Sequence, residues 1–210
     1  MLKNKVVIIT GASSGIGEAC AYAFAKKGCK VALAARSIDK LAGVEEQIKQ
    51  MGAEVIKVQC DVSVKTDCDK LVKETVAAFG TVDILINNAG ISMRAIFNEM
   101  EVEVLEKVMD VHFYGTVYTT KYALPYILKN KGSVVGVSSI AGYLGLPART
   151  GDSASKYAMQ GFLDALRTEN LNKVLHVMVA CPGFTASNIR NTALSADGSS
   201  QGETPRDESK

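Results

Sequence analysis

The chain turns at Thr10-Gly11-Ala12-Ser13-Ser14-Gly15-Ile16-Gly17, and this stretch decides its fold. It joins a β-branched run at residues 5–10 to a helical pattern at 15–27. Glycines let the backbone turn tightly and let a phosphate approach without an intervening Cβ. The helix that follows offers free N–H groups and its positive dipole end to an anion. A structural turn is the alternative, but the strand–turn–helix context favours a loop that binds a pyrophosphate.

The alternation of strand and helix continues along the chain. Further apolar runs typical of strands lie at residues 31–35, 55–60, 82–87, 133–137 and 176–180. Ser37 and Ser63 are predicted N-caps, and Gly52 and Gly80 follow helices where a left-handed residue is favoured. Six nearly unbroken apolar strands between amphipathic helices predict a parallel sheet covered on both faces. The expected fold class is α/β, a doubly wound Rossmann sheet in a single domain.

The composition excludes several classes of function. The 210 residues suit one domain, and 47% apolar with 22% charged residues is ordinary for a globular protein. A formal net charge of +2 gives no electrostatic basis for binding nucleic acid. No apolar run approaches the roughly 20 residues of a membrane helix, and residues 1–5 lead into a strand without a signal peptide.

Cysteine and histidine spacing predicts neither a redox motif nor a metal site. The five cysteines form no CxxC pair and leave one odd thiol, which favours a reducing, cytoplasmic location. The two histidines, His112 and His176, have no metal-ligand spacing with the cysteines.

The end of the second predicted strand bears on the choice of dinucleotide. An NAD site needs an acid here to bond the ribose 2′-hydroxyl, yet residues 34–36 contain none, and Asp39 comes later in the next helix. Arg36 instead offers a planar fork of donors suited to a 2′-phosphate. NADP(H) is therefore favoured, with a solvated residue at a helix start as the alternative interpretation of Arg36.

Taken in order, these motifs resemble the short-chain dehydrogenase/reductase family over nearly all of residues 5–190. The matching stretches are TGASSGIG at 10–17, Asp61-Val62, Asn87-Asn88-Ala89-Gly90, Ser138-Ser139, Lys156 and Pro182-Gly183. The resemblance implies that Asp61 and Val62 hold the adenine and that residues 88–90 line the floor of the site. The full set of expected cofactor-binding residues is Gly11, Ser13, Ser14, Gly15, Ile16, Gly17, Arg36, Asp61, Val62, Asn88, Ala89, Gly90, Lys156, Pro182, Gly183 and Thr185.

The resemblance also implies an active site built from an Asn, a Ser, a Tyr and a Lys. Ser139 and Lys156 stand at the serine and lysine positions. The tyrosine position, thirteen residues after the serine and four before the lysine, reads Asp152, and the asparagine position reads His112. These four residues are the candidate catalytic set, and two of them depart from the family pattern.

An aspartate is a poor replacement for the tyrosine. In the family the tyrosine exchanges a proton with the substrate oxygen while hydride moves between the nicotinamide and a ketone or secondary alcohol. A carboxyl with a pKa of about 3.9, lowered further by an ammonium one turn away, has no proton to donate at neutral pH. General acid–base catalysis contributes about 10²–10⁴-fold, so carbonyl reduction is expected to be severely impaired. The alternative function is a pseudo-enzyme that binds NADP(H) without turnover.

Other interpretations of individual residues stay open. Asp152 resembles an ordinary N-cap, a role compatible with the loss of the acid. His112 is either a partly buried structural histidine or the holder of a water that links Lys156 to solvent. Tyr143, four residues after Ser139, is a possible rescue acid.

A helical stripe within residues 157–171 favours self-association. The small residues Ala158, Gly161 and Ala165 lie at helical spacing with Phe162 and Leu166, and small residues let helices approach closely. The family commonly pairs this helix and the preceding one, so the resemblance implies a homodimer or homotetramer; the alternative is that the stripe faces the protein's own sheet.

The resemblance further implies a helix and a seventh strand beyond Lys210, so the fold is expected to lack the family's C-terminal strand. Residues 1–194 are predicted to form the NADP-binding domain with the active site. Residues 195–210, which are polar and contain Gly and Pro, are predicted to be a loop or the disordered end of a substrate lid. The substrate itself is not readable beyond a small carbonyl or alcohol.

Overall fold

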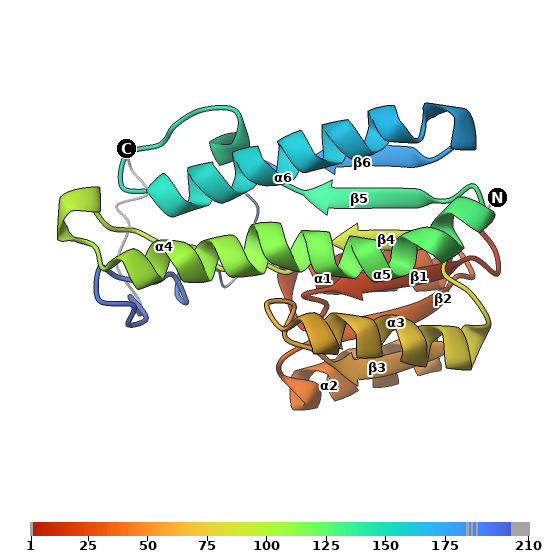
Figure 1. The fold of residues 1–210 in the computed structure, drawn as a ribbon. Helices are drawn as coiled ribbons and strands as arrows, with labels where there is room; N and C mark the ends of the chain where they lie inside the picture. The colour runs from red at the N-terminus through yellow and green to blue at the C-terminus, as the bar shows by residue number, and fades with distance from the viewer. Residues whose placement is uncertain (1, 184, 186, 188, 203–210) are drawn as a thin grey trace.

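A computed structural model of the chain describes residues 2–183, 185, 187 and 189–202 and shows a parallel sheet flanked by helices (Figure 1). The six strands are β1 (Val6–Thr10), β2 (Lys30–Ala35), β3 (Val55–Gln59), β4 (Ile84–Asn87), β5 (Ser133–Val137) and β6 (His176–Ala180). The helices are α1 (Gly15–Lys26), α2 (Ile38–Gln50), α3 (Lys65–Phe79), α4 (Val102–Met109), α5 (Gly115–Lys129) and α6 (Thr150–Glu169). The strand order is β3-β2-β1-β4-β5-β6, which confirms the doubly wound α/β fold.

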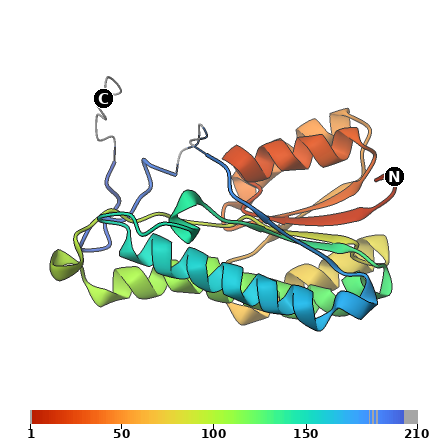
Figure 2. The same ribbon diagram turned by 90° about the horizontal axis from the view of Figure 1, so that it is seen from above.

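The sheet is buried between two helical layers because its strands are apolar on both faces. In β1, Ile8 joins the core beneath α3, α5 and α6, while its neighbours Val7 and Ile9 join the core beneath α1 and α2. Figure 2 shows α1 and α2 on one side of the sheet and α5 with α6 on the other. A short π-helical segment, Asp110–Tyr114, connects α4 to α5, and short 3₁₀ turns lie at Phe97–Glu99, Ile140–Gly142 and Leu171–Lys173.

The order of the strands reverses next to β1, and this point positions the site. The chain moves outward from β1 through β2 to β3 and then crosses to β4 on the other side of β1. Thr10 Oγ1 accepts the backbone N–H groups of Asn88 and Ala89, each at 3.0 Å. The loops after β1 and β4 are therefore held together where open α/β sheets bind their ligands.

The helix ends follow the sequence in part. Gly52 and Gly80 adopt the predicted left-handed conformation, with φ of 76° and 83°. Ser37 occupies the N-cap of α2, although its side chain makes no capping hydrogen bond. The prediction for Ser63 is wrong: α3 begins one residue later than expected, and Ser63 instead donates its hydroxyl and N–H to Asp61 Oδ1.

The segment at 189–202 packs against the loop that follows β4. Leu194 N–H donates to the carbonyl of Ser92 at 2.8 Å, and Arg94 N–H donates to the carbonyl of Leu194 at 2.9 Å. Within the predicted C-terminal loop, Gln201 N–H donates to the carbonyl of Ala193 at 2.8 Å, and 203–210 lie outside the described residues. Among the helices that the structure describes, none is both long and apolar enough to cross a membrane.

Candidate active site and dinucleotide cleft

The loop after β1 has the properties of a phosphate cradle. Helix α1 begins at Gly15, and its N-cap Ser14 makes no side-chain capping hydrogen bond, which leaves the first N–H groups of the helix available. A Cβ at Gly17 would lie 2.3 Å from the carbonyl oxygen of Gly11, so the close return of the helix onto the loop requires glycine there. The free N–H groups and the dipole end suit a pyrophosphate.

A cleft of about 350 Å³ runs along the carboxyl ends of β1, β2 and β4. Most of the predicted cofactor-binding residues line it: Gly11, Ser13, Ser14, Gly15, Ile16, Arg36, Asp61, Val62, Asn88, Ala89 and Gly90. Gly17 lies behind the loop, and Lys156, Pro182, Gly183 and Thr185 are not among the residues that line the cleft. The volume falls within the range of small-molecule sites, about 300–1,000 Å³.

Cations outnumber acids along this cleft. Arg36, Lys40 and Lys107 line it together with one carboxylate, that of Asp61. Lys40 and Lys107 were missed by the sequence reasoning, although Lys40 follows Arg36 by only four residues, a spacing that was available as a signal. The charge balance and the glycine loop fit a dinucleotide with several phosphates.

Three predicted residues follow β6. Pro182, Gly183 and Thr185 come directly after that strand, and Thr185 Oγ1 donates to the carbonyl of Gly183 at 3.2 Å. The neighbouring strand end is tied to β6 because Ser138 N–H donates to the carbonyl of Ala180 at 2.7 Å. Their predicted contact with the nicotinamide stays a prediction.

Ser139 follows β5 directly, and Lys156 is hydrogen-bonded to the end of the same strand. Lys156 Nζ donates to the carbonyl of Val137 at 2.9 Å, and Gln160 Nε2 donates to Ser138 Oγ at 2.8 Å, so α6 is tied to this strand end. Ser139 Oγ accepts the N–H of Ala141 at 3.3 Å, which leaves its own hydrogen free to donate. Burial lowers the pKa of Lys156 to about 8, while the nearby Asp152 opposes that shift.

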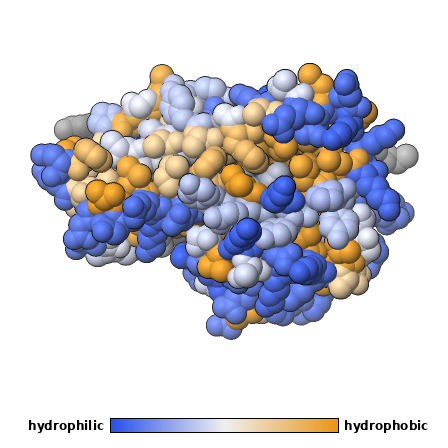
Figure 3. All heavy atoms as spheres, viewed as in Figure 1, coloured by the Kyte–Doolittle hydropathy of each residue, from blue (hydrophilic) through white to orange (hydrophobic). Residues whose placement is uncertain are grey.

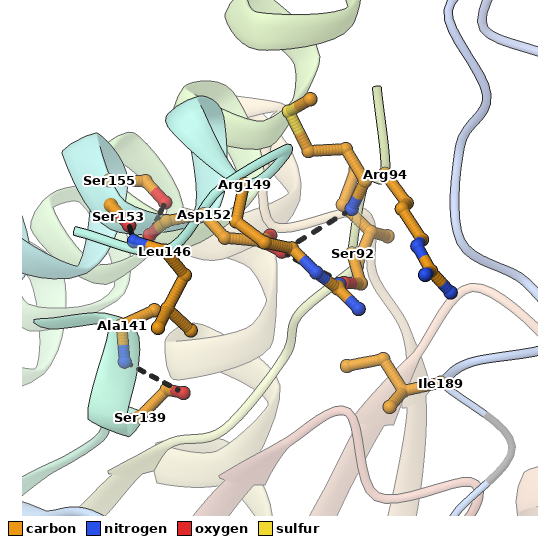
Figure 4. A network of polar contacts seen from close by, with 12 residues as sticks. Ser92, Arg94, Ser139, Ala141, Leu146, Arg149, Asp152, Ser153, Ser155 and Ile189 are labelled. Atoms are coloured by element: carbon orange, nitrogen blue, oxygen red, sulfur yellow. Dashed lines mark hydrogen bonds and ion pairs between the residues drawn. The ribbon is translucent and has the colours of Figure 1, made fainter. Parts of the chain in front are cut away.

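The carboxyl of Asp152 is hydrogen-bonded to Arg149 and to Ser92, which lies in the loop after β4 (Figure 4). Its Oδ2 accepts hydrogen bonds from Ser92 Oγ at 2.9 Å and Arg149 Nη1 at 3.1 Å, with the N–H of Met93 at 3.5 Å. Arg149 Nη1 also donates to Ser92 Oγ. Oδ1 of the same carboxyl is buried and has no partner among the described residues.

This geometry corrects two expectations for Asp152. It is the third residue of α6, and its carboxyl accepts from another segment rather than capping its own helix. Burial raises the pKa of Asp152 above its ordinary value, although hydrogen bonds from Ser92 and Arg149 act in the opposite direction. Burial, and not the expected effect of Lys156, therefore determines the direction in which the pKa of Asp152 shifts.

His112 is buried in the π-helical segment, with 2% of its surface exposed. Its Nε2 accepts the N–H of Ile91 at 3.2 Å, and its Nδ1 lies 2.8 Å from Ser155 Oγ. Burial and the charge of Lys156 hold the pKa of His112 well below its ordinary value, so the ring is neutral. Both ring nitrogens have protein partners, so the structure supports the buried, structural interpretation and leaves neither nitrogen free for the proposed water.

Tyr143 is exposed on the loop between β5 and α6. A hydrogen bond with the thiol of Cys181 raises the pKa of the phenol, which keeps it protonated. Its role as a rescue acid stays a prediction. In the described part of the chain, no three His, Cys, Asp or Glu side chains gather as a metal site would require.

Comparison with known proteins adds an independent finding. The family model described as short chain dehydrogenase matches residues 5–197. An 11-beta-hydroxysteroid dehydrogenase-like 2 from Arabidopsis thaliana is 43% identical over 188 residues, which are 89% of this chain and 61% of that relative. A dehydrogenase/reductase SDR family protein 7-like from Drosophila melanogaster is 39% identical and covers 96% of this chain. This chain spans less than two thirds of either relative, 61% and 64%.

Two solved structures are also similar. A short-chain dehydrogenase/reductase from Burkholderia phymatum in complex with NAD superposes with a TM-score of 0.87 at 30% identity, covering 90% of this chain and 69% of that one. An alcohol dehydrogenase from Thermococcus sibiricus complexed with 5-hydroxy-NADP gives a TM-score of 0.86 at 28% identity, covering 97% and 83%.

The buried ammonium of Lys156 predicts a pH-dependent stability. Its pKa falls from 10.5 in the unfolded chain to about 8 in the folded protein, so between these values the unfolded chain binds the extra proton and stability rises with pH. Relative to a Lys156→Met variant, the protein should gain about 1 kcal/mol of unfolding free energy per pH unit between about pH 8 and 10. Urea titrations across that range measure the difference. An exposed control, Lys129→Met, should show no such trend, and a flat difference for Lys156→Met would contradict the assignment.

Proposed function

This chain belongs to the short-chain dehydrogenase/reductase family, and we propose that it binds NADP(H) and acts on a ketone or secondary alcohol with severely impaired catalysis. The proposal rests on a contrast between the dinucleotide cleft and the neighbouring position of the proton donor. The dinucleotide cleft keeps its glycine loop and its cations, whereas the proton donor's position holds a carboxyl engaged with Arg149.

The preference for NADP(H) rests on the charge at one end of the cleft. Arg36 and Lys40 both line it just beyond β2, and no acid occupies 34–36. A guanidinium binds a phosphate through paired hydrogen bonds, and a second cation adds to the attraction. Of the two solved relatives, one is complexed with NAD and the other with an NADP derivative, so both cofactor types occur among similar proteins.

The remaining residues support part of the family's chemistry. When bound, NADP(H) would supply or accept the hydride. Ser139 has a free hydroxyl hydrogen that can donate to a developing oxyanion. Lys156, fixed to the carbonyl of Val137, places a positive charge beside the same position. Transition-state charge can therefore be stabilised, but the group that should deliver the proton is missing.

Asp152 does not replace that group in this geometry. Its Oδ2 accepts three hydrogen bonds from the protein, including one from a guanidinium, and these oppose the rise in its pKa that burial causes. An ionised carboxylate cannot donate a proton, and it repels a nascent alkoxide. The same engagement favours the second candidate function, a protein that holds NADP(H) without turnover.

Three further proposals follow from the sequence. We propose a cytoplasmic location, because all five cysteines are free thiols, as in a reducing compartment. Residues 1–194 are proposed to form the NADP-binding domain, with 195–210 as a polar loop or the end of a substrate lid. The outer faces of α5 and α6 are proposed to pair with a second copy of the chain.

The proposed pairing surface is apolar and lined with small residues. Figure 3 shows apolar side chains in a band over α5 and α6. Gly161 is exposed and a Cβ there would meet nothing within 4 Å, and Ala165 is exposed as well. Leu166 does not belong to this face, because it is buried in the core between the sheet and helices α3, α5 and α6. The predicted stripe is thus divided, with its small residues outward.

The first prediction from this function concerns the cofactor. The protein should bind NADPH at least tenfold more tightly than NADH, because Arg36 can pair with the 2′-phosphate. Fluorescence titration at moderate salt measures both affinities. The Arg36→Ala variant should lose most of this preference with little change for NADH. Equal affinities in the unaltered protein would rule out the assignment.

The second prediction concerns the missing acid. Asp152→Tyr should reduce ketones with NADPH about 10²-fold faster than the unaltered protein, which is the size of a general acid contribution. Asp152→Phe is the matched control, because it has similar bulk but no hydroxyl, and it should show no gain. Single-turnover assays on a ketone panel measure the rates. If the unaltered protein already matches the tyrosine variant, another acid such as Tyr143 must supply the proton.

The third prediction concerns association. Light scattering at micromolar concentration should give at least a dimer, and Gly161→Arg should shift the population toward monomer by placing a charge on the close-contact face. Gly43→Arg, on the exposed side of α2, is the control and should leave the mass unchanged. A monomer for the unaltered protein would remove this proposal.

A further inference from the structure

Two arginines from separate segments of the chain lie near the candidate active site, on either side of a backbone hydrogen bond. Arg94 belongs to the loop after β4, and Arg149 is the N-cap residue of α6. The N–H of Ala95 donates to the carbonyl of Ala148 at 3.2 Å, so the two arginines flank one backbone hydrogen bond. In Figure 4 both guanidinium groups extend toward Ile189.

Both guanidinium groups keep donors available. Arg149 uses only Nη1, in its bonds to Ser92 and Asp152, so Nε and Nη2 donate to no described residue. The side chain of Arg94 is exposed and makes no ion pair or hydrogen bond with any residue that the structure describes. Arg149 is ion-paired with Asp152, so Arg94 brings a positive charge that no described carboxylate pairs with.

The pair adjoins the end of the dinucleotide cleft where substrate would enter. Ile91, Ile189 and Leu194 line that end, and Leu194 is bonded directly to the Ser92–Arg94 backbone. Asp152, which holds Arg149 in place, occupies the position of the family's proton donor. Asp152 therefore holds the guanidinium of Arg149 next to the position of the family's proton donor.

We propose that Arg94 and Arg149 form an anion subsite that recognises the carboxylate of a carbonyl-bearing or hydroxyl-bearing acid. A planar guanidinium pairs with a carboxylate through two parallel hydrogen bonds, and Arg149 is already oriented by Asp152 and Ser92, so little side-chain freedom is lost on binding. Arg94 supplies the second cation from the opposite segment. This inference rests on the proposed oxidoreductase function and names its substrate class.

The experiment uses a pair of ketones that differ only in charge. The protein is saturated with NADP⁺, which cannot reduce a ketone, and titrated by calorimetry with 4-acetylbenzoate and with the neutral 4-acetylbenzamide. We expect the carboxylate to bind at least tenfold more tightly than the amide, with a preference that weakens as salt is raised. Arg94→Gln should reduce the preference to about threefold or less, whereas Lys129→Gln, which removes a distant exposed charge, should keep it.

The outcomes separate the two proposals. NADP⁺ binding is measured first by itself, and its absence would overturn the cofactor assignment; the ketone titrations are then run without cofactor, so the subsite is still tested. If NADP⁺ binds but both ketones bind equally, or if Arg94→Gln keeps the full preference, the anion subsite is wrong. Thermal unfolding of Arg94→Gln confirms that the variant is folded, which is expected because its side chain contacts no described partner.

Discussion

The hydroxyl of Thr10 holds the site together, because it accepts two backbone N–H groups from the loop after β4. Strands β1 and β4 border the point where the strand order reverses. The crevice at this point exists only if the loops that follow these two strands stay at a fixed separation. Asn88 completes the connection by donating its side-chain amide to the carbonyls of Thr10 and Gly11. A Cβ at Gly11 would lie 2.8 Å from Ala89 Cα, so the contact also requires glycine. The cleft, its glycine loop and the neighbouring active site all depend on this junction.

The fold was predictable because its signals are local and repeated. Each apolar run became a strand within two residues of the expected bounds, and the glycines at 52 and 80 end their helices as expected. The misplaced N-cap at Ser63 has a different cause. Asp61 competes for the serine's hydroxyl and N–H, so the turn closes before the helix begins. Such a competition involves two polar residues two positions apart, and the spacing alone does not say which of them the backbone will use.

The candidate catalytic residues stay a prediction, but the structure shows pairings for them that the sequence did not predict. Sequence spacing placed Asp152 one turn from Lys156 and predicted that the ammonium would lower the pKa of the carboxyl. In the folded protein the carboxyl turns toward Ser92, 60 residues earlier in the chain, and Arg149 joins it there. Lys156 meanwhile satisfies its ammonium with the carbonyl of Val137. These partners come from the packing of α6 against two loops, and no pattern within α6 itself encodes that packing.

Under the proposed function, an aspartate at position 152 does more than remove a proton donor. A phenol and a carboxylate differ in charge as well as in length, so a carboxylate buried at this position needs a cationic partner to offset its desolvation. Arg149 supplies that partner from three residues earlier in the chain. The unpaired, buried Oδ1 shows that the compensation is incomplete, and burial accordingly raises the pKa of Asp152. Under the proposed function, the loss of the acid and the fixation of the Arg149 guanidinium both follow from one difference from the family pattern. We propose that a site altered in this way still binds the dinucleotide but transfers protons poorly, which is why binding and turnover must be measured separately in this protein.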